Sequence, residues 1–343
     1  MRAVIFREHG GPEVLEYTEV PTPAVGPNEA LIRVRACGLN RLDVLVRAGT
    51  VPQTIPRPHI PGSEVAGEVA AVGANVTHLT PGQRVVVHPY LSCGLCEYCL
   101  AGAEELCLRG DILGLRSNGG YAEYVCVPAA MVVPLPEPLS FSEGAALTLS
   151  TLTAWHMLVT RARLRPGEDV LVLAAGSNVG SAAIQIARLC GARRVFATVG
   201  SPAKVAPARA LGADHVIVGR ETDFAAEVRR LTGRRGVDVV VEHVGAATWE
   251  RSIASLTRGG RLVSCGALTG RHGQTDLAQF FGKELQLLGC FGGTRAELRQ
   301  VLQAAAEGRL RAVIDSRFPL AEAAAAQQRL EASAHFGKIV LEV

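Results

Sequence analysis

The feature that most constrains the fold is a repeated alternation of apolar, strand-like runs with helical segments. DVLVLAA (169–175) is followed by the helical SAAIQIARLCGA and then by RVFATV (194–199), and the rhythm continues through VDVVVEHV (237–244) and RLVSCGA (261–267). Strands that alternate with crossover helices form a parallel sheet. VDVVVEHV is apolar at most positions, which is typical of a strand buried on both faces. We therefore predict an α/β fold with a doubly wound parallel sheet over residues 153–292.

The segment before this alternation has a different rhythm. Residues 1–152 contain short apolar runs such as ALIRVRACGL, GEVAAVG and YAEYVCVP, separated by Pro and Gly. This pattern predicts an antiparallel, barrel-like β domain. After residue 293 the chain returns to shorter units and ends in GKIVLEV. We expect residues 1–152 and 293–343 to form one domain, interrupted by a second domain over 153–292. A length of 343 residues is typical of two domains.

Composition excludes several classes of function. Basic and acidic residues are interspersed and give a formal net charge of only +3, so the sequence offers no continuous positive field for nucleic acid or an acidic membrane. The N-terminus MRAVIFREHGG lacks the pattern of a signal peptide, and no apolar run reaches the length of a membrane span. We expect a cytoplasmic protein that binds neither nucleic acid nor membrane.

Four of the nine cysteines are clustered in CGLCEYCLAGAEELC, with the spacing C-x2-C-x2-C-x7-C. Two residues between ligands allow a tight knuckle to place two sulfurs on one tetrahedral ion, and four thiolates leave zinc no open position. The pattern predicts a structural zinc lobe over 93–107. Reduced cysteines without metal and an iron–sulfur cluster are the alternatives, although ferredoxin-type spacings differ from this one. The predicted ligands are Cys93, Cys96, Cys99 and Cys107.

A candidate nucleotide-binding turn follows the first strand of the alternation. DVLVLAA runs into GSNVG and then into a helix, which is where backbone N–H groups and the helix dipole bind a dinucleotide pyrophosphate. The glycine signature is diluted, because Ala175, Ser177 and Gly180 occupy the positions of G-x-G-x-x-G. An ordinary strand-to-helix turn is therefore the alternative. The predicted cofactor residues of this turn are Ser177, Asn178, Val179 and Gly180.

The end of the second strand indicates which dinucleotide binds. NAD enzymes place an acidic residue there for the ribose 2′-OH, but this chain has Gly200, Ser201 and then Lys204. A hydroxyl and a cation favour a 2′-phosphate, so we expect NADP(H) rather than NAD(H), although Lys204 can also be an ordinary exposed lysine. Further cofactor neighbours are expected after later strands, at Gly245, Gly266 and Gly289.

Several segments together carry a family resemblance: EALIRVRACGLNRLD, PGSEVAGEV, the cysteine lobe, GGYAEYVCVP, ALTLSTLTAWHML, the nucleotide turn and FGKIVLEV. Over essentially its full length the chain resembles the medium-chain dehydrogenase/reductase superfamily, which includes zinc alcohol dehydrogenases and quinone oxidoreductases. The resemblance implies a GroES-like β-barrel catalytic domain, a Rossmann dinucleotide-binding domain, substrate in the cleft between them, and hydride transfer.

The resemblance also shows a departure at the catalytic metal. Metal-dependent members hold zinc with a cysteine, a histidine and a second cysteine, and these positions fall on Asn40, Ser63 and near Leu149 here. An amide, an alcohol and an aliphatic side chain do not form a zinc site. Glu64, which follows the histidine position, is retained. A rearranged zinc site built from Cys37, His59 or Glu64 is the alternative.

The missing ligands favour a particular reaction. A quinone or an α,β-unsaturated carbonyl accepts hydride with only a hydrogen bond to its oxygen, whereas alcohol oxidation depends on the metal to remove a proton. We expect an NADP(H)-dependent reductase of such small molecules, with Asn40, Thr153 and Glu64 as catalytic candidates. The alternatives are a zinc alcohol dehydrogenase and a non-catalytic NADPH sensor. Pairing of the apolar run LQLLGCF predicts a dimer or tetramer.

Overall fold

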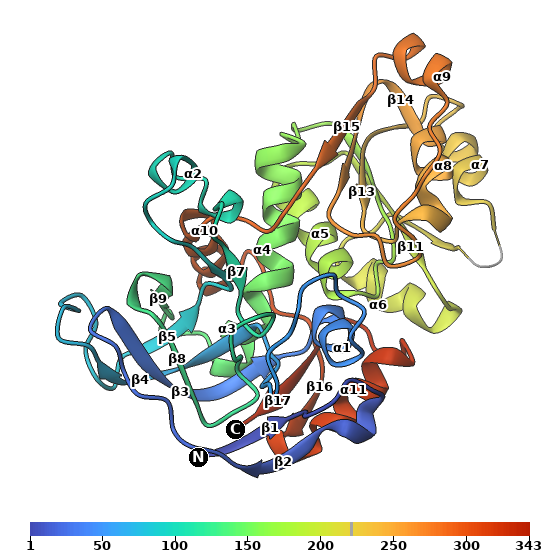
Figure 1. Ribbon diagram of the computed structural model, residues 1–343. Coiled ribbons are helices and arrows are strands. Elements are labelled where there is room, and N and C mark those ends of the chain that lie inside the picture. The colour runs from blue at the N-terminus through green and yellow to red at the C-terminus, as the bar shows by residue number, and fades with distance from the viewer. Residues whose placement is uncertain (220–221) are drawn as a thin grey trace. The chain divides into compact units, whose positions relative to one another are not determined.

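The computed structural model describes residues 1–219 and 222–343, and the chain divides into two compact units (Figure 1). The first unit consists of Met1–Leu152 with Gly293–Val343, and the second of Thr153–Gly292. Across the described residues, we find no helix with the length and apolar character that a membrane crossing requires.

The first unit is built around a seven-stranded sheet in the order β16-β17-β3-β4-β5-β9, with β8 also paired to β3. All of these pairs are antiparallel except β16 with β17, which is parallel. Alternate side chains of β3, including Ile32 and Val34, enter a core that also contains Val65 and Val85. The strands are β3 (Glu29–Gly38), β4 (Glu64–Val72), β5 (Arg84–Val87), β8 (Tyr124–Pro128), β9 (Val132–Pro134), β16 (Ile314–Pro319) and β17 (Lys338–Glu342).

The register of three of these strands brings distant parts of the chain together. Gly38 lies opposite Val340 in β17 and opposite Glu64 in β4. The end of β3 therefore lies beside the start of β4 and the start of β17, which begins with Lys338. Because these pairings are hydrogen-bonded ladders, the side chains at the three strand ends are held in fixed positions.

Smaller elements complete the first unit. Helix α3 begins with a capping box in which Ser140 Oγ accepts from the backbone of Glu143 and the Glu143 carboxylate accepts from the backbone of Ser140. The short strands are β1 (Arg2–Ile5), β2 (Glu16–Glu19), β6 (Tyr90–Leu91) and β7 (Asp111–Ile112). The helices are η1 (Pro12–Val14), α1 (Arg41–Arg47), α2 (Glu97–Leu100), η2 (Glu104–Leu106), η3 (Ala129–Met131), α3 (Phe141–Leu147), α10 (Arg295–Ala306), η6 (Leu320–Glu322) and α11 (Ala323–Glu331). Helix α4 (Leu149–Trp155) begins in the first unit and ends in the second.

The second unit has a six-stranded parallel sheet in the order β12-β11-β10-β13-β14-β15 (Figure 1). Strand order reverses between β10 and β13, which is the switch point where such sheets bind nucleotides. This is the doubly wound sheet predicted from the sequence. The strands are β10 (Asp169–Val172), β11 (Arg194–Val199), β12 (His215–Val218), β13 (Val237–Glu242), β14 (Leu256–Ser264) and β15 (Gln286–Gly289). The helices are η4 (His156–Arg161), α5 (Asn178–Leu189), η5 (Pro202–Lys204), α6 (Val205–Ala210), α7 (Phe224–Leu231), α8 (Ala246–Ala254) and α9 (Leu277–Gly282).

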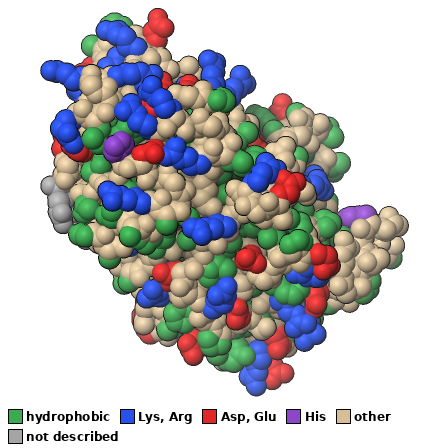
Figure 2. Space-filling view, turned by 180° about the vertical axis from the view of Figure 1, so that it is seen from behind, with side chains coloured by type: hydrophobic (Ala, Val, Ile, Leu, Met, Phe, Trp, Pro, Cys, Tyr) green, Lys and Arg blue, Asp and Glu red, His purple; other side chains and the backbone are tan. Residues whose placement is uncertain are grey.

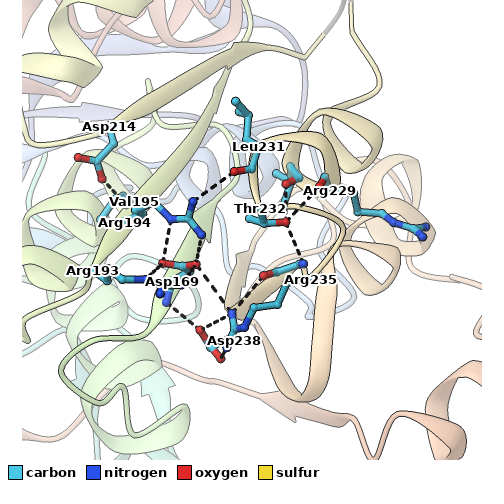
Figure 3. A network of polar contacts seen from close by, with 12 residues as sticks. Asp169, Arg193, Arg194, Val195, Asp214, Arg229, Leu231, Thr232, Arg235 and Asp238 are labelled. Atoms are coloured by element: carbon cyan, nitrogen blue, oxygen red, sulfur yellow. Dashed lines mark hydrogen bonds and ion pairs between the residues drawn. The ribbon is translucent and has the colours of Figure 1, made fainter.

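A buried carboxylate joins the first residues of neighbouring strands in this unit (Figure 3). Asp169 begins β10 and is fully buried, and its Oδ2 accepts from Arg193 and Arg194 at 2.6 Å each. Arg235 lies 3.8 Å from the same oxygen and pairs with Asp238 of β13. Burial opposes the charge of Asp169, but the hydrogen bonds from the two arginines outweigh it and lower its pKa below the usual 3.8. The network fixes the N-terminal ends of the three central strands β10, β11 and β13, whereas nucleotides bind at the C-terminal ends of such strands.

Basic side chains are concentrated in the second unit, as the blue residues over its surface in Figure 2 illustrate. Residues 153–292 contain 18 Lys and Arg against 11 Asp and Glu. A cavity of about 550 Å³ at the N-terminal side of β14 and β15 is lined by several of these arginines. No candidate catalytic or cofactor residue lines this cavity, so it is not part of the candidate site. Its arginines are Arg161, Arg163, Arg165 and Arg261.

Candidate active site and metal centre

The four clustered cysteines converge in the structure. Their sulfurs all lie within 4.8 Å of one another, with Cys96 3.5 Å from Cys99 and 3.8 Å from Cys107. Four thiolates at about 2.3 Å from one tetrahedral zinc are about 3.8 Å apart, so this arrangement suits zinc. Across residues 1–219 and 222–343, it is the only group of three or more Cys, His, Asp or Glu side chains arranged to hold a metal.

The surroundings of the sulfurs also favour a bound cation. Hydrogen bonds from the backbone of Leu95 and Cys96 lower the pKa of Cys93 to about 5, whereas burial and the neighbouring cysteines raise the pKa of Cys99 to about 11. Four thiolates this close repel one another unless a cation neutralises them. The lobe is attached to α10 through Glu104, which accepts from the backbone N–H of Arg295 at 2.7 Å and from its Nε at 3.1 Å.

A buried polar cluster occupies the strand ends described above. The ammonium of Lys338 lies 2.6 Å from Oε2 of Glu64 and donates to Oδ1 of Asn40 at 2.9 Å. It also donates to the carbonyl of Leu39 at 2.8 Å. Lys338 is 2% exposed and Glu64 is 0% exposed. An isolated charge is unstable at such depth, so the pair and its hydrogen bonds form one unit.

Glu64 connects this cluster to α4. Its Oε1 accepts from the backbone N–H groups of Leu149 at 3.1 Å and Ser150 at 2.9 Å, at the start of the helix, where backbone donors have no partner from a preceding turn. Oγ of Ser150 donates to Oδ1 of Asn40 at 2.9 Å and lies 3.3 Å from Oε1 of Glu64. Both carboxylate oxygens of Glu64 are therefore engaged within the first unit.

One end of the Asn40 amide is unused. Its side chain is 8% exposed, and its Nδ2 has no hydrogen-bond partner among the described residues. The hydroxyl of Ser63 is likewise buried and unpartnered there. Buried polar atoms are rarely left without a partner, so an orphaned amide donor indicates a place for a ligand atom.

Asp43 lies in the first turn of α1, whose N-cap is Asn40. Its Oδ2 accepts from the backbone N–H of Asn40 at 2.8 Å and from the hydroxyl of Tyr121 at 3.1 Å. Burial raises the pKa of Asp43 to about 7. Further along α1, Arg47 donates to Gln327 at 2.6 Å and attaches the helix to α11.

The structure does not bring together the rearranged zinc site. Cys37 lies in the hydrophobic core, and Nε2 of His59 is 3.0 Å from the carbonyl oxygen of Gly114. Among the described residues, no group of three or more metal-ligating side chains includes Cys37, His59 or Glu64. The position corresponding to the remaining cysteine ligand holds Leu149, whose backbone binds Glu64.

In the second unit, the predicted nucleotide turn connects β10 to α5. Ser177 caps the helix, and its Oγ accepts from the backbone of Gly180 at 3.0 Å and lies 3.1 Å from Nε2 of His243. Asn178 and Val179 form the first turn of α5, and backbone N–H groups at the start of a helix can bind phosphate oxygens. A Cβ at Gly180 would lie 2.5 Å from the carbonyl oxygen of Ala174, so only glycine fits this close approach.

The remaining candidates follow the C-terminal ends of the parallel strands. Gly200 and Ser201 follow β11. The aliphatic stem of Lys204 covers the turn between β10 and α5, because a Cβ built on Gly176 of that turn would lie 2.8 Å from Cδ of Lys204. Thr153 is buried on α4. Gly245, Gly266 and Gly289 lie at the ends of β13, β14 and β15.

Sequence reasoning missed Lys338, Ser150 and Tyr121 as members of the polar cluster. Lys338 lies in the quoted FGKIVLEV segment, but no spacing rule links it to Asn40. The available signal was a single lysine at the start of an otherwise apolar run. Only the pairing of β17 with β3 places that lysine beside Asn40.

Comparison with known proteins identifies the family. Residues 26–137 match the model "Alcohol dehydrogenase GroES-like domain", and residues 178–307 match "Zinc-binding dehydrogenase". The chain is 32% identical to the quinone oxidoreductase of Homo sapiens, over 99% of this chain and 97% of that protein. It is 34% identical to an alcohol dehydrogenase of Geobacillus stearothermophilus, over the full length of both. The chain belongs to the medium-chain dehydrogenase/reductase superfamily.

Solved structures of this superfamily agree with that assignment. A crystal structure of an NAD-dependent alcohol dehydrogenase superimposes with a TM-score of 0.96 at 47% identity and full coverage of both chains. The expected Rossmann and GroES-like folds are therefore confirmed. As a medium-chain dehydrogenase/reductase, the chain is an oxidoreductase of small molecules with a nicotinamide cofactor, and its four-cysteine site suits zinc. Its relatives include both quinone oxidoreductases and alcohol dehydrogenases, so their names are compatible with either reaction.

Proposed function

We propose that this chain is an NADP(H)-dependent reductase of quinones or α,β-unsaturated carbonyl compounds. In this proposal one zinc at the cysteine lobe has a structural role, and no catalytic metal takes part. The observation that supports it best is the composition of the polar cluster. An amide from Asn40, a carboxylate from Glu64 and the ammonium of Lys338 share the cluster, and a buried ammonium beside the carboxylate already supplies its counter-charge. Zinc requires thiolate, imidazole or carboxylate ligands, and this donor set does not fit it.

The proposed chemistry follows from the unused amide donor. A bound reduced nicotinamide supplies hydride to the electron-poor carbon of the substrate. As the electron pair moves to the substrate oxygen, Nδ2–H of Asn40 donates to that oxygen and stabilises its developing negative charge. A solvent proton completes the reduction. Thr153 is our second candidate donor, and Glu64 contributes by holding the ammonium and the start of α4.

NADP(H) is supported by the end of β11. No acidic residue follows this strand, and Lys204 covers the glycine turn with a cationic head. We expect Lys204→Ala to weaken NADPH binding by about tenfold and to leave NADH binding within about twofold. The similar solved structure is named NAD-dependent, which favours NAD(H) as the alternative. An equal loss of affinity for NADPH and NADH in Lys204→Ala would favour that alternative.

One experiment tests the reaction and the metal together. Full-length protein is assayed with NADPH and NADH against quinones, enones, aldehydes and alcohols, and zinc is counted on the same sample. We expect about one zinc per chain, turnover of quinones or enones, and no alcohol oxidation. Two zinc ions per chain with alcohol oxidation that chelation abolishes would overturn the proposal and support an alcohol dehydrogenase. Tight NADPH binding without any turnover would support the sensor function.

A further inference from the structure

We propose that Lys338 is a positioning residue that fixes the Asn40 amide so that its N–H donors face the reacting oxygen of the substrate. The inference rests on the proposed function in one respect, because it takes Asn40 as the donor to that oxygen. Lys338 acts through Asn40 and does not contact substrate in this scheme. Three observations support the proposal: the bonds to the amide oxygen, the register of the strands, and the orphaned amide nitrogen.

The bonds to the amide oxygen fix the orientation of Asn40. An ammonium has only hydrogen-bond donors, so its 2.9 Å contact with Asn40 must be made to the amide oxygen. Oγ of Ser150 donates to the same oxygen at 2.9 Å. Rotation of the amide by 180° would place its NH₂ group against the ammonium. The two contacts therefore determine which end of the amide remains unused.

The unused end is the nitrogen. Nδ2 of Asn40 has no partner among the described residues, and its side chain is more than nine-tenths buried. The cation beside Oδ1 also withdraws electron density from the amide, which strengthens the N–H donors at the opposite end. Lys338 thus orients the amide and increases its ability to stabilise negative charge.

The cluster is built into the sheet. Gly38 lies opposite Val340 in β17 and opposite Glu64 in β4, so the same register brings Lys338 beside Asn40. A Cβ at Gly38 would lie 2.2 Å from Oε2 of Glu64 and 3.2 Å from Cδ of Lys338. Only glycine leaves room there for the ion pair to cross the strand end. Glu64 offsets the cost of burying the ammonium, and the ammonium holds the amide.

The first test compares variants of the cluster in the full-length protein. Lys338→Met should lower kcat for quinone or enone reduction by roughly 100-fold, with KM within about threefold, because the lost interaction acts in the transition state. Lys338→Arg should recover activity to within about tenfold of the wild type. If Lys338→Met leaves Glu64 uncompensated and misfolds, Glu64→Gln with Lys338→Met removes both charges. The matched control is Arg84→Met, which removes a partly buried cation that donates to Glu137 and Leu139 in the same unit.

A double-mutant cycle separates positioning from a structural role. If Lys338 acts through Asn40, Lys338→Met should cost nothing further in a protein that already carries Asn40→Ala. Multiplicative losses from the two substitutions would overturn the proposal, because Lys338 would then act independently of the amide. An unchanged kcat in Lys338→Met would also overturn it.

A readout without turnover keeps this inference distinct from the proposed function. The chain has five asparagines, so selective ¹⁵N labelling of asparagine gives few side-chain amide signals, and Asn40→Ala assigns the one of interest. We expect Lys338→Met to shift the Asn40 amide signal and Arg84→Met to leave it in place. Wild-type protein that reduces no quinone or enone overturns the proposed function, whereas an unshifted Asn40 signal in Lys338→Met overturns the role of Lys338.

Discussion

At the residue scale, the protonation of Asp43 couples the stability of the first unit to pH. Asp43 is fully buried, and burial raises its pKa to about 7 from the usual 3.8. As pH rises, the unfolded chain loses this proton near pH 4, but the folded protein keeps it until about pH 7. The folded state therefore binds more protons in this window, and stability from this group falls as pH rises through it.

The substitution Asp43→Asn removes this titration and keeps a hydrogen-bond acceptor beside the backbone of Asn40. Between about pH 5 and about pH 8, the wild type should lose roughly 2–3 kcal/mol of unfolding free energy relative to the variant. Urea unfolding followed by far-UV circular dichroism at several pH values measures this difference. All other titrating groups are common to both proteins. Parallel pH dependences would show that Asp43 is ionised in the folded state throughout.

A second residue-scale prediction concerns the close approach at Gly180. Gly180→Ala places a methyl group 2.5 Å from the carbonyl oxygen of Ala174, so the start of α5 must move away from the turn. We expect dinucleotide affinity to fall by at least about tenfold. Both tryptophans, Trp155 and Trp249, lie in residues 153–292, so their fluorescence reports NADPH binding to this unit. Gly282→Ala, where a Cβ meets nothing within 4 Å, is the control and should bind normally.

At the element scale, the Asp169 network makes the central strands of the second unit depend on one carboxylate. Asp169→Asn would leave Arg193, Arg194 and Arg235 without their shared anion, and breaking a buried pair typically costs about 3–5 kcal/mol. Urea unfolding followed by tryptophan fluorescence should show this loss in the second unit, with the zinc content of the lobe unchanged. Arg230→Gln, which breaks the exposed pair with Glu227, should have a much smaller effect. A similar small cost for Asp169→Asn would contradict the role of the network.

The pH dependence of this network has the opposite sign to that of Asp43. The pKa of Asp169 is lowered in the folded protein, so its contribution to stability is present above the unfolded value near 3.8 and is lost as pH falls through the folded value. The wild type and Asp169→Asn should therefore begin to converge in stability near pH 4 and should become equal only below the folded pKa of Asp169.

The two sheets differ in how far the sequence reveals them. After residue 152, the contacts of the sheet are made between strands and helices that are neighbours in the sequence. The alternation of strand and helix therefore predicts the parallel sheet. The pairing of β17 with β3 joins segments about 300 residues apart, and nothing local in FGKIVLEV specifies that register. Asn40 and Glu64 could be singled out by residue type, but the ammonium between them depends on that long-range pairing. The zinc ligands were predictable because a short spacing determines their geometry.

At the scale of the whole molecule, β15 is an edge strand of the sheet in the second unit, and no strand among the described residues pairs with its outer side. Open edges are commonly paired or protected, and a two-fold axis through β15 would join two chains. The backbone N–H of Cys290 donates to Ser264 of β14. Because backbone groups alternate in direction along a strand, the N–H of Gly289 then faces the outer edge, on the same side as its carbonyl oxygen, which accepts from Nε of Arg161 at 2.9 Å. A proline at 289 would remove an edge donor and leave the pairing with β14 in place.

We therefore expect the wild type to be a dimer or tetramer and Gly289→Pro to dissociate toward the monomer. Light scattering coupled to size-exclusion chromatography, over about a hundredfold range of protein concentration, measures both states, and a tenfold weaker association corresponds to about 1.4 kcal/mol. Tryptophan fluorescence verifies that the second unit of the variant remains folded. Gly282→Ala should retain the wild-type assembly, because its added Cβ meets nothing within 4 Å. A monomeric wild type, or a variant that assembles as the wild type does, would show that chains do not associate through the β15 edge.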